Sequence, residues 1–181
     1  MVDGRWSMAV SGEAVCAPAT SMLQQVNPLR TNINMIWIEK TFESLTTTEL
    51  YELLHLRSEV FVVEQNCPYQ DMDYADQQAV HVMGYNDDHK LVAYTRLFGP
   101  GIKYEMASIG RVITAKEVRG TGAGRALMEK SIALLEARFG KQPIKIGAQQ
   151  YLLNFYSSLG FRQSSDMYLE DGIPHVEMIR E

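Results

Sequence analysis

Glycines spaced two residues apart carry the clearest chemical signal in this chain. Gly120, Gly122 and Gly124 follow an apolar, β-branched run that predicts a buried strand, and they stand where a helix is expected to begin. Because glycine has no side chain, successive backbone N–H groups can face one point, and the first helical turn adds unpaired donors and partial positive charge. A strand, a glycine turn and a helix together predict a phosphate site.

The charge of this segment agrees with an anionic ligand. From Arg111 to Lys130 there are five basic and two acidic residues, whereas the whole chain carries a net charge of −5. A local positive site on an acidic protein favours an anionic small molecule over nucleic acid.

Two common nucleotide motifs do not fit the glycines. A P-loop requires Lys and Ser/Thr after its last glycine, but Arg125 and Ala126 follow Gly124. A dinucleotide fingerprint, Gly-x-Gly-x-x-Gly, requires a third glycine where Arg125 or Leu127 stands. Both nucleotide interpretations are therefore weakened.

The segment 119–124 resembles the acetyl-CoA motif of the GCN5-related N-acetyltransferases (GNAT), Arg/Gln-x-x-Gly-x-Gly/Ala, and matches it at every fixed position. Three further blocks, residues 56–71, 147–161 and 170–175, resemble the ElaA-like branch of that superfamily. The resemblance covers most of residues 35–180. It implies the GNAT fold, an α+β (α/β sandwich) architecture in which helices flank a mixed, mostly antiparallel central sheet with a splayed cofactor cleft. It also implies acetyl-CoA as co-substrate.

The resemblance assigns roles to particular positions. It implies that Tyr156 is the general acid that protonates the thiolate of coenzyme A, although a tyrosine on an apolar helix stripe could equally be a buried residue with a satisfied hydroxyl. The residues expected to bind the cofactor are Val112, Ile113, Arg119, Gly120, Thr121, Gly122, Ala123, Gly124, Arg125 and Asn154.

The residues that receive the acceptor are less defined. An alkyl ammonium must lose a proton before it attacks a thioester, and Glu64, Asp71, His81, Glu170 and His175 could each accept it directly or through water. Tyr94 and Arg96 lie two apart on a predicted strand, so they share one face and line either a cavity or the solvated side of the sheet. The histidines lack matched ligand spacing, so no metal is expected.

Three carboxylates stand close together in the loop after the first predicted helix. Asp71, Asp73 and Asp76 fall within six residues, a pattern typical of a solvated surface. The functional alternative is an acidic rim that attracts a cationic amine.

Hydrophobic periodicity predicts the element order β-α-β-β-β-α-β-α-β-β. The first strand is expected at 36–38 and a helix with a Thr46–Glu49 capping box from there to about residue 64. Strands follow at 80–85, 91–97 and 109–113, then a helix from Gly124 to Phe139. The last elements are a strand at 143–149, a helix at 150–159, and a hairpin of 167–169 and 176–179 around Asp171-Gly172.

Composition indicates one ordinary globular domain. The chain has 181 residues, of which 46% are hydrophobic and 22% charged. Residues 1–34 show no sustained periodicity and are expected to be an N-terminal extension before an N-acetyltransferase domain at 35–181. No apolar run approaches the roughly 20 residues that cross a bilayer, so a cytoplasmic location is expected.

The sequence thus predicts an acetyl-CoA-dependent N-acetyltransferase that acts on a primary amine of a small molecule or peptide in a ternary complex. The alternative is a non-catalytic acyl-CoA-binding or regulatory module. Expected partners are the amine or peptide substrate, with neither nucleic acid nor membrane, and homodimer assembly is left open.

Overall fold

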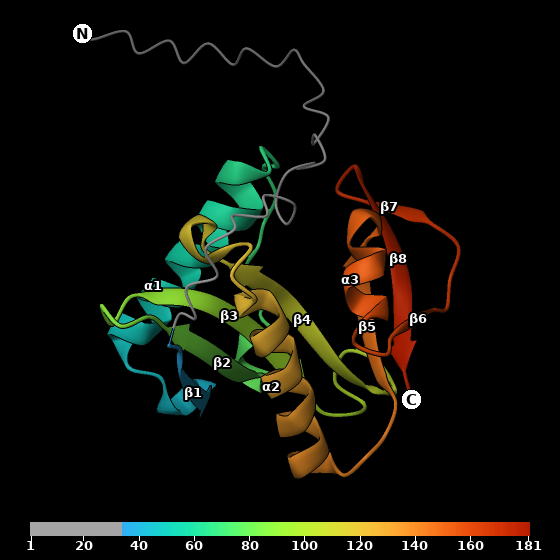
Figure 1. Cartoon of the computed structure of the whole chain (residues 1–181), viewed down its shortest axis with the longest axis horizontal. Helices are drawn as coiled ribbons and strands as arrows, with labels where there is room; N and C mark the ends of the chain where they lie inside the picture. The colour runs from blue at the N-terminus through green and yellow to red at the C-terminus, as the bar shows by residue number, and fades with distance from the viewer. Residues whose placement is uncertain (1–33) are drawn as a thin grey trace, which may run out of the picture.

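One large sheet organises the part of the chain that the computed structural model describes, residues 34–181 (Figure 1). The expected extension at 1–34 lies outside those residues apart from Asn34. The sheet has eight strands in the order β1-β2-β3-β4-β5-β8-β6, and β7 pairs with β8. The strands are β1 (Ile36–Thr41), β2 (Val80–Tyr85), β3 (Leu91–Phe98), β4 (Ala107–Thr114), β5 (Ile144–Gln149), β6 (Arg162–Gln163), β7 (Tyr168–Glu170) and β8 (Ile173–Arg180). All neighbouring pairs are antiparallel except β4 with β5, which confirms the mixed, mostly antiparallel sheet.

Two of the helices in the described residues begin where the sequence signals predicted, and the last begins three residues later than expected. The α1 helix (Thr47–Arg57) has the expected capping box, in which Thr46 and Glu49 each accept a hydrogen bond from the other's backbone. It continues as a π-helical segment, Ser58–Glu64. The α2 helix (Ala123–Phe139) follows the glycines and ends at Gly140 with φ 76°. The α3 helix (Leu153–Ser157) is short and follows a 3₁₀ turn at Gln150–Leu152.

The two faces of the sheet form two hydrophobic cores. Leu97 of β3 packs in one core with Leu127 and Leu135 of α2. Tyr94 of the same strand packs in the other core with Leu53 of α1. This alternation follows from the two-residue period of a strand and leaves α1 and α2 on opposite faces (Figure 1).

The parallel strands β4 and β5 diverge soon after they meet. Only Ala107 with Ile144 and Ser108 with Lys145 are paired, although both strands continue for several residues. Figure 1 shows β4 and β5 separating from this point. We call this opening the splay. Backbone groups of β4 that face the splay lack a neighbouring strand, so the sheet offers an internal edge there.

A β-bulge in β4 lies beside the splay. The pairing of β3 with β4 shifts between Tyr94 and Arg96, and Arg111 adopts φ 53°, which is uncommon for a residue with a side chain. The Thr95 hydroxyl donates a hydrogen bond to the carbonyl of Gly110 over 2.7 Å. This bond fixes the bulge and turns the Arg111 side chain toward the splay.

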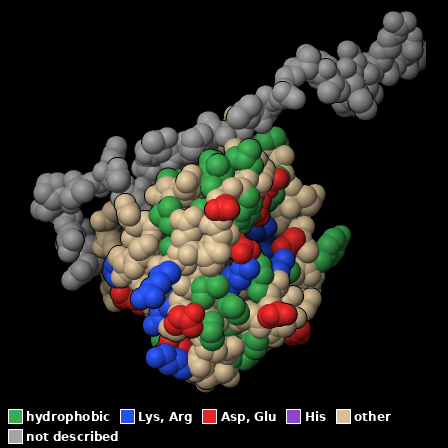
Figure 2. Space-filling model, turned by 90° about the vertical axis from the view of Figure 1, so that its right-hand side faces the viewer, with side chains coloured by type: hydrophobic (Ala, Val, Ile, Leu, Met, Phe, Trp, Pro, Cys, Tyr) green, Lys and Arg blue, Asp and Glu red, His purple; other side chains and the backbone are tan. Residues whose placement is uncertain are grey.

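The molecular surface carries interspersed charges. Figure 2 shows acidic and basic side chains mixed with hydrophobic ones on the face turned 90° from Figure 1. Within residues 34–181, none of the helices has both the length and the apolar character that crossing a bilayer requires.

Candidate active site

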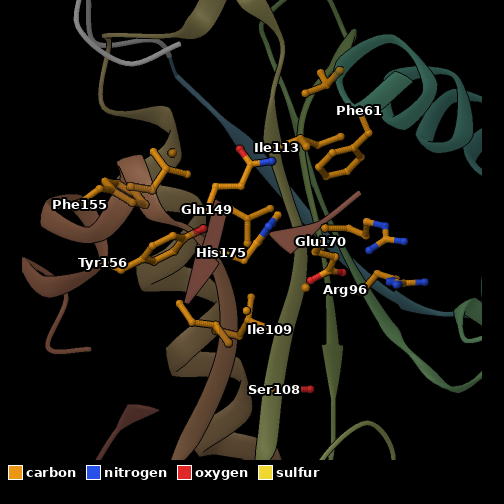
Figure 3. Close-up of a pocket in the computed structure, with 18 of the residues that line it drawn as sticks. Phe61, Arg96, Ser108, Ile109, Ile113, Gln149, Phe155, Tyr156, Glu170 and His175 are labelled. Carbon is orange, nitrogen blue, oxygen red and sulfur yellow. The ribbon is translucent and has the colours of Figure 1, made fainter. Parts of the chain in front are cut away.

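A cavity of about 350 Å³ occupies the splay (Figure 3). Gly110 to Thr114 of β4 form one wall, and Ile146, Gly147 and Gln149 of β5 form the other. The cavity reaches Gly124 of α2 at one side of the sheet, and Arg96 and Lys103 at the other. A ligand inside it could therefore contact both faces of the sheet.

The glycine end of the cavity has the geometry of an anion site. Gly120 and Gly122 adopt φ 77° and 98°, a left-handed conformation that side chains disfavour. No side chain caps α2, so its first N–H groups remain available to a ligand. A Cβ at Gly124 would make ordinary van der Waals contact with Phe155 and Thr114, at 3.9 and 4.0 Å. These features fit the pyrophosphate of a coenzyme A, the group that the sequence predicts here.

The basic residues beside this end are held by the protein. Arg119 donates to the Thr114 carbonyl at 2.9 Å and pairs with Glu64 at 2.8 Å. This ion pair explains the position of Glu64, which was a candidate base but does not line the cavity. Arg125 extends from the exposed side of α2 toward Ser158. Arg119 therefore holds the glycine turn in place. The guanidinium of Arg125 adds a positive charge near the start of α2.

Tyr156 lies at the centre of the cavity. Its side chain is 5% exposed and packs edge-on against Phe155 and Phe161. Figure 3 shows its hydroxyl directed into the cavity toward His175. Within residues 34–181 that hydroxyl has no hydrogen-bonding partner, so the satisfied buried tyrosine considered from the sequence is not what the structure shows. Burial, with a smaller contribution from Tyr151, raises the pKa of Tyr156 well above its usual value, so the phenol stays protonated.

His175 and Glu170 reach the same cavity from the β7–β8 hairpin. The Nδ1 atom of His175 lies 2.8 Å from the Ile173 carbonyl oxygen. A carbonyl only accepts, so Nδ1 carries a hydrogen, and in the neutral form of the ring the lone pair is on Nε2. Tyr168 stacks on the imidazole with ring centroids 6.0 Å apart and holds its orientation. Of the five candidate bases, these two line the cavity.

The remaining candidates are placed elsewhere. His81 is fully buried between the Tyr94 hydroxyl and the Asp76 carbonyl, and burial lowers its pKa. Tyr94 is also buried and does not line the cavity, whereas Arg96 does. Asn154 is exposed on α3 outside the cavity, so its predicted contact with the cofactor stays a prediction.

The predicted solvated acidic loop is wrong, and so is the alternative of an acidic rim. Asp71 and Asp76 are each 6% exposed because they pair with arginines from three different elements. We call this group of side chains, together with Lys103 at its edge, the Arg–Asp cluster: Arg57, Arg96, Lys103, Arg111, Asp71, Asp73 and Asp76. Sequence spacing could not reveal it, since the arginines lie 14 to 40 residues from their partners.

Arg57 lies at the centre of the Arg–Asp cluster. Its side chain has no exposed surface, and it bonds Asp71 at 2.8 Å and Asp76 at 2.7 Å. Arg111 bonds the second oxygen of Asp71 at 2.7 Å. The cluster therefore joins α1, β3 and β4 to the loop before β2, and it forms the wall of the cavity on the α1 face of the sheet.

We predict that the cluster makes the protein sensitive to acid. Burial alone would raise the pKa of Asp71, but Arg57 and Arg111 outweigh it and lower that pKa. Arg96 and Lys103 likewise outweigh burial at Asp73 and lower its pKa. A carboxyl whose pKa is lowered by folding stabilises the protein above its unfolded pKa of about 4 and loses that contribution as the pH falls further.

Urea unfolding at several pH values measures this effect. The free energy of unfolding should fall between about pH 4 and pH 2, and Asp73→Asn should flatten the fall. Asp88→Asn, in the exposed turn after β2, is the matched control and should keep the wild-type slope. An equal slope for all three proteins would contradict the prediction.

Sequence reasoning missed a bridge across the splay. Gln149 of β5 donates a hydrogen bond to Gln65, just after the π-helical segment, over 3.2 Å, and both side chains line the cavity. Nearby, Cys67 and Tyr69 pack against Ile173 of β8. Two polar residues 84 positions apart give no pattern that predicts such a contact.

Comparison with known proteins decides the family. Residues 43–181 match the sequence model of the acetyltransferase (GNAT) domain. The chain belongs to the GNAT acetyltransferase family. Protein ElaA of Escherichia coli is 43% identical over 147 residues, which are 80% of this chain and 95% of that protein. A UPF0039 protein of Schizosaccharomyces pombe is 41% identical over 80% of this chain and 96% of its own length.

Solved GNAT structures share the fold described above. The crystal structure of Escherichia coli ElaA superposes with a TM-score of 0.77 at 41% identity, covering 82% of this chain and all of the other. An acyl-CoA N-acyltransferase from Pseudomonas aeruginosa gives 0.78 at 41% identity with the same coverage. The expected GNAT fold and the ElaA-like branch are therefore confirmed.

Proposed function

We propose that the protein transfers an acetyl group from acetyl-CoA to a primary amine of a small molecule or peptide, with both substrates bound together. The observation that carries this proposal is the continuous cavity through the splay, which joins the glycine turn on one side of the sheet to His175 and Glu170 on the other. Membership of the GNAT family supports acyl transfer, and the similarity to the Pseudomonas aeruginosa protein, which is described as an acyl-CoA N-acyltransferase, supports an amine acceptor.

The glycine turn and β4 are the parts that would hold acetyl-CoA. The turn at Gly120–Gly124 presents backbone N–H groups to the pyrophosphate. The unpaired edge of β4 at Val112 and Ile113 offers backbone groups to the pantetheine amides, as in the addition of a strand. Bound in this way, acetyl-CoA supplies an activated carbonyl carbon for attack.

The end of the cavity where the amine would bind supplies the base. The lone pair on His175 Nε2 takes a proton from the ammonium, directly or through water. The Glu170 carboxylate lines the same cavity and attracts the cation. The freed amine forms the C–N bond as the C–S bond breaks. The departing thiolate takes the proton of the Tyr156 hydroxyl, which burial keeps protonated, and the new amide nitrogen gives up its extra proton to the resulting phenolate, directly or through water.

Replacing Gly124 by leucine tests the cofactor site. Gly124 has no left-handed φ, and its Cβ position meets no atom closer than 3.9 Å, so a Cβ fits there; thermal unfolding shows whether the whole leucine side chain keeps the fold. Leucine also has better helix propensity than glycine. We expect calorimetry to show coenzyme A binding weakened about 100-fold, a loss of about 2.7 kcal/mol.

The control is a leucine on the exposed face of the same helix. Ala133→Leu should keep the wild-type affinity for coenzyme A. If wild-type protein gives no heat with coenzyme A, or if Gly124→Leu binds normally, the proposed cofactor site is not where the structure suggests. If coenzyme A binds tightly but no amine in a broad panel releases it from acetyl-CoA, a binding module replaces the enzyme as the better interpretation.

A further inference from the structure

One buried nitrogen in the cavity wall has no partner. Arg96 is 2% exposed and lines the cavity, and its Nε is the one side-chain nitrogen or oxygen within residues 34–181 that has almost no exposed surface of its own and forms no hydrogen bond. The other guanidinium nitrogens of Arg96 are bound to Asp73 and Asp76 at 2.7 to 3.1 Å. Buried donors are nearly always paired in folded proteins, so the unpaired Nε points to an acceptor that a ligand brings.

The charges around Arg96 favour an anionic acceptor atom. The Arg–Asp cluster contains four basic side chains and three acidic ones, so it carries one excess positive charge on a protein of net charge −5. Three of those basic side chains line the cavity: Arg96, Lys103 and Arg111. A carboxylate oxygen would satisfy the Nε donor and neutralise the excess charge at the same time.

Two other residues that line this cavity suit a cation. Glu170 contributes a carboxylate, and His175 presents the lone pair of Nε2. Figure 3 shows both on the β7–β8 hairpin, in the same cavity as Arg96. Cationic and anionic groups therefore face one space, which matches a ligand that carries both charges.

We propose that the acceptor is a small amino-carboxylate, whose amine lies at His175 and Glu170 and whose carboxylate binds Arg96 at the edge of the Arg–Asp cluster. This rests on the proposed function and names the substrate class of the same site. An amine that has no carboxylate would leave the Arg96 Nε without a partner and the excess positive charge of the cluster without a counter-charge. The carboxylate therefore provides discrimination between amines as well as affinity.

Matched pairs of acids and amides test the proposal. The full-length protein, saturated with acetyl-CoA, is given α-, β- and γ-amino acids, the amide of each, and alkylamines of the same length, and release of coenzyme A is followed. We expect at least one amino acid to be acetylated with a kcat/KM about tenfold or more above its amide, with the difference mainly in KM.

Two variants locate the effect. Arg96→Lys keeps the charge but removes the Nε donor. Lys103→Gln removes a charge that lines the cavity, on a side chain that is 37% exposed. Both should reduce the acid-to-amide ratio by about fivefold or more. Lys141→Gln, an exposed lysine outside the cavity, is the control and should leave the ratio unchanged. Lys103→Gln keeps the test informative if Arg96→Lys fails to fold.

Each outcome bears on the proposal. Acetylation of amides or alkylamines as efficiently as acids overturns the carboxylate site and leaves the proposed function standing. An unchanged ratio in folded Arg96→Lys and in Lys103→Gln also overturns it. A panel in which no amino acid is acetylated overturns it too, and the coenzyme A titration described above then shows whether the proposed function fails with it.

Discussion

Replacing Tyr156 by phenylalanine should lower kcat by a factor of about 10² to 10⁴, the usual contribution of a positioned general acid. The hydroxyl lies in the cavity without a protein partner, so its removal takes away a proton donor and little structure. Coenzyme A affinity should change by less than about threefold, because phenylalanine keeps the ring that packs on Phe155 and Phe161. Steady-state kinetics and calorimetry measure the two quantities separately.

A control variant shows whether the loss of kcat is specific to the Tyr156 hydroxyl or follows from removing any tyrosine hydroxyl. Tyr51→Phe removes a hydroxyl that is exposed on α1, far from the cavity, and should keep wild-type kcat. Thermal unfolding should be nearly unchanged for Tyr156→Phe, since a hydroxyl without a hydrogen bond contributes little to stability. A normal kcat for Tyr156→Phe would show that Tyr156 takes no part in the proton transfer. If the variant also unfolded at a lower temperature, the hydroxyl would have a structural role in the core instead.

Replacing Arg57 by methionine should lower the free energy of unfolding by about 3 kcal/mol, near the lower end of the range for breaking a buried ion pair. Methionine fills similar volume but leaves Asp71 and Asp76 without their shared partner. The loss is not larger because Arg111 still pairs with Asp71, and Arg96 with Asp76. Urea unfolding at pH 7 measures it.

The matching exposed pair shows how much burial matters. Lys90 and Glu117 also form an ion pair, but their side chains are 65% and 46% exposed. Lys90→Met should therefore cost less than about 1 kcal/mol. If both variants lose the same stability, burial does not strengthen the Arg–Asp cluster.

Local signals in the sequence predicted the elements well. The Thr46–Glu49 box, the Gly140 stop and the Asp171-Gly172 turn each depend on chemistry within four residues, and each is present in the structure. The last predicted helix is shorter than its apolar stripe suggested, because its first turn is 3₁₀. The two-residue strand β6 was missed, since so short a strand depends on its partner β8.

Long-range contacts decided what the sequence could not predict. Tyr156 and Gly124 were chosen through a motif, and the structure brings both to one cavity. His175 and Glu170 stand out from the five candidate bases because the β7–β8 hairpin brings them to the cavity. The aspartates were misinterpreted because charge runs in sequence say nothing of the arginines that meet them in space. Arg111 was expected in a regular strand, and its bulge is set by Thr95 of the neighbouring strand.

The bridge between Gln65 and Gln149 has a consequence for the route of the acceptor. Strand pairing closes the splay at Ser108 and Lys145, and the bridge, with the apolar contact of Tyr69 and Ile173, closes it at the far end. Contacts therefore bound the splay at both of its ends along β4 and β5. An acceptor that meets acetyl-CoA in this cavity, as proposed above, would reach the thioester between these two points of contact.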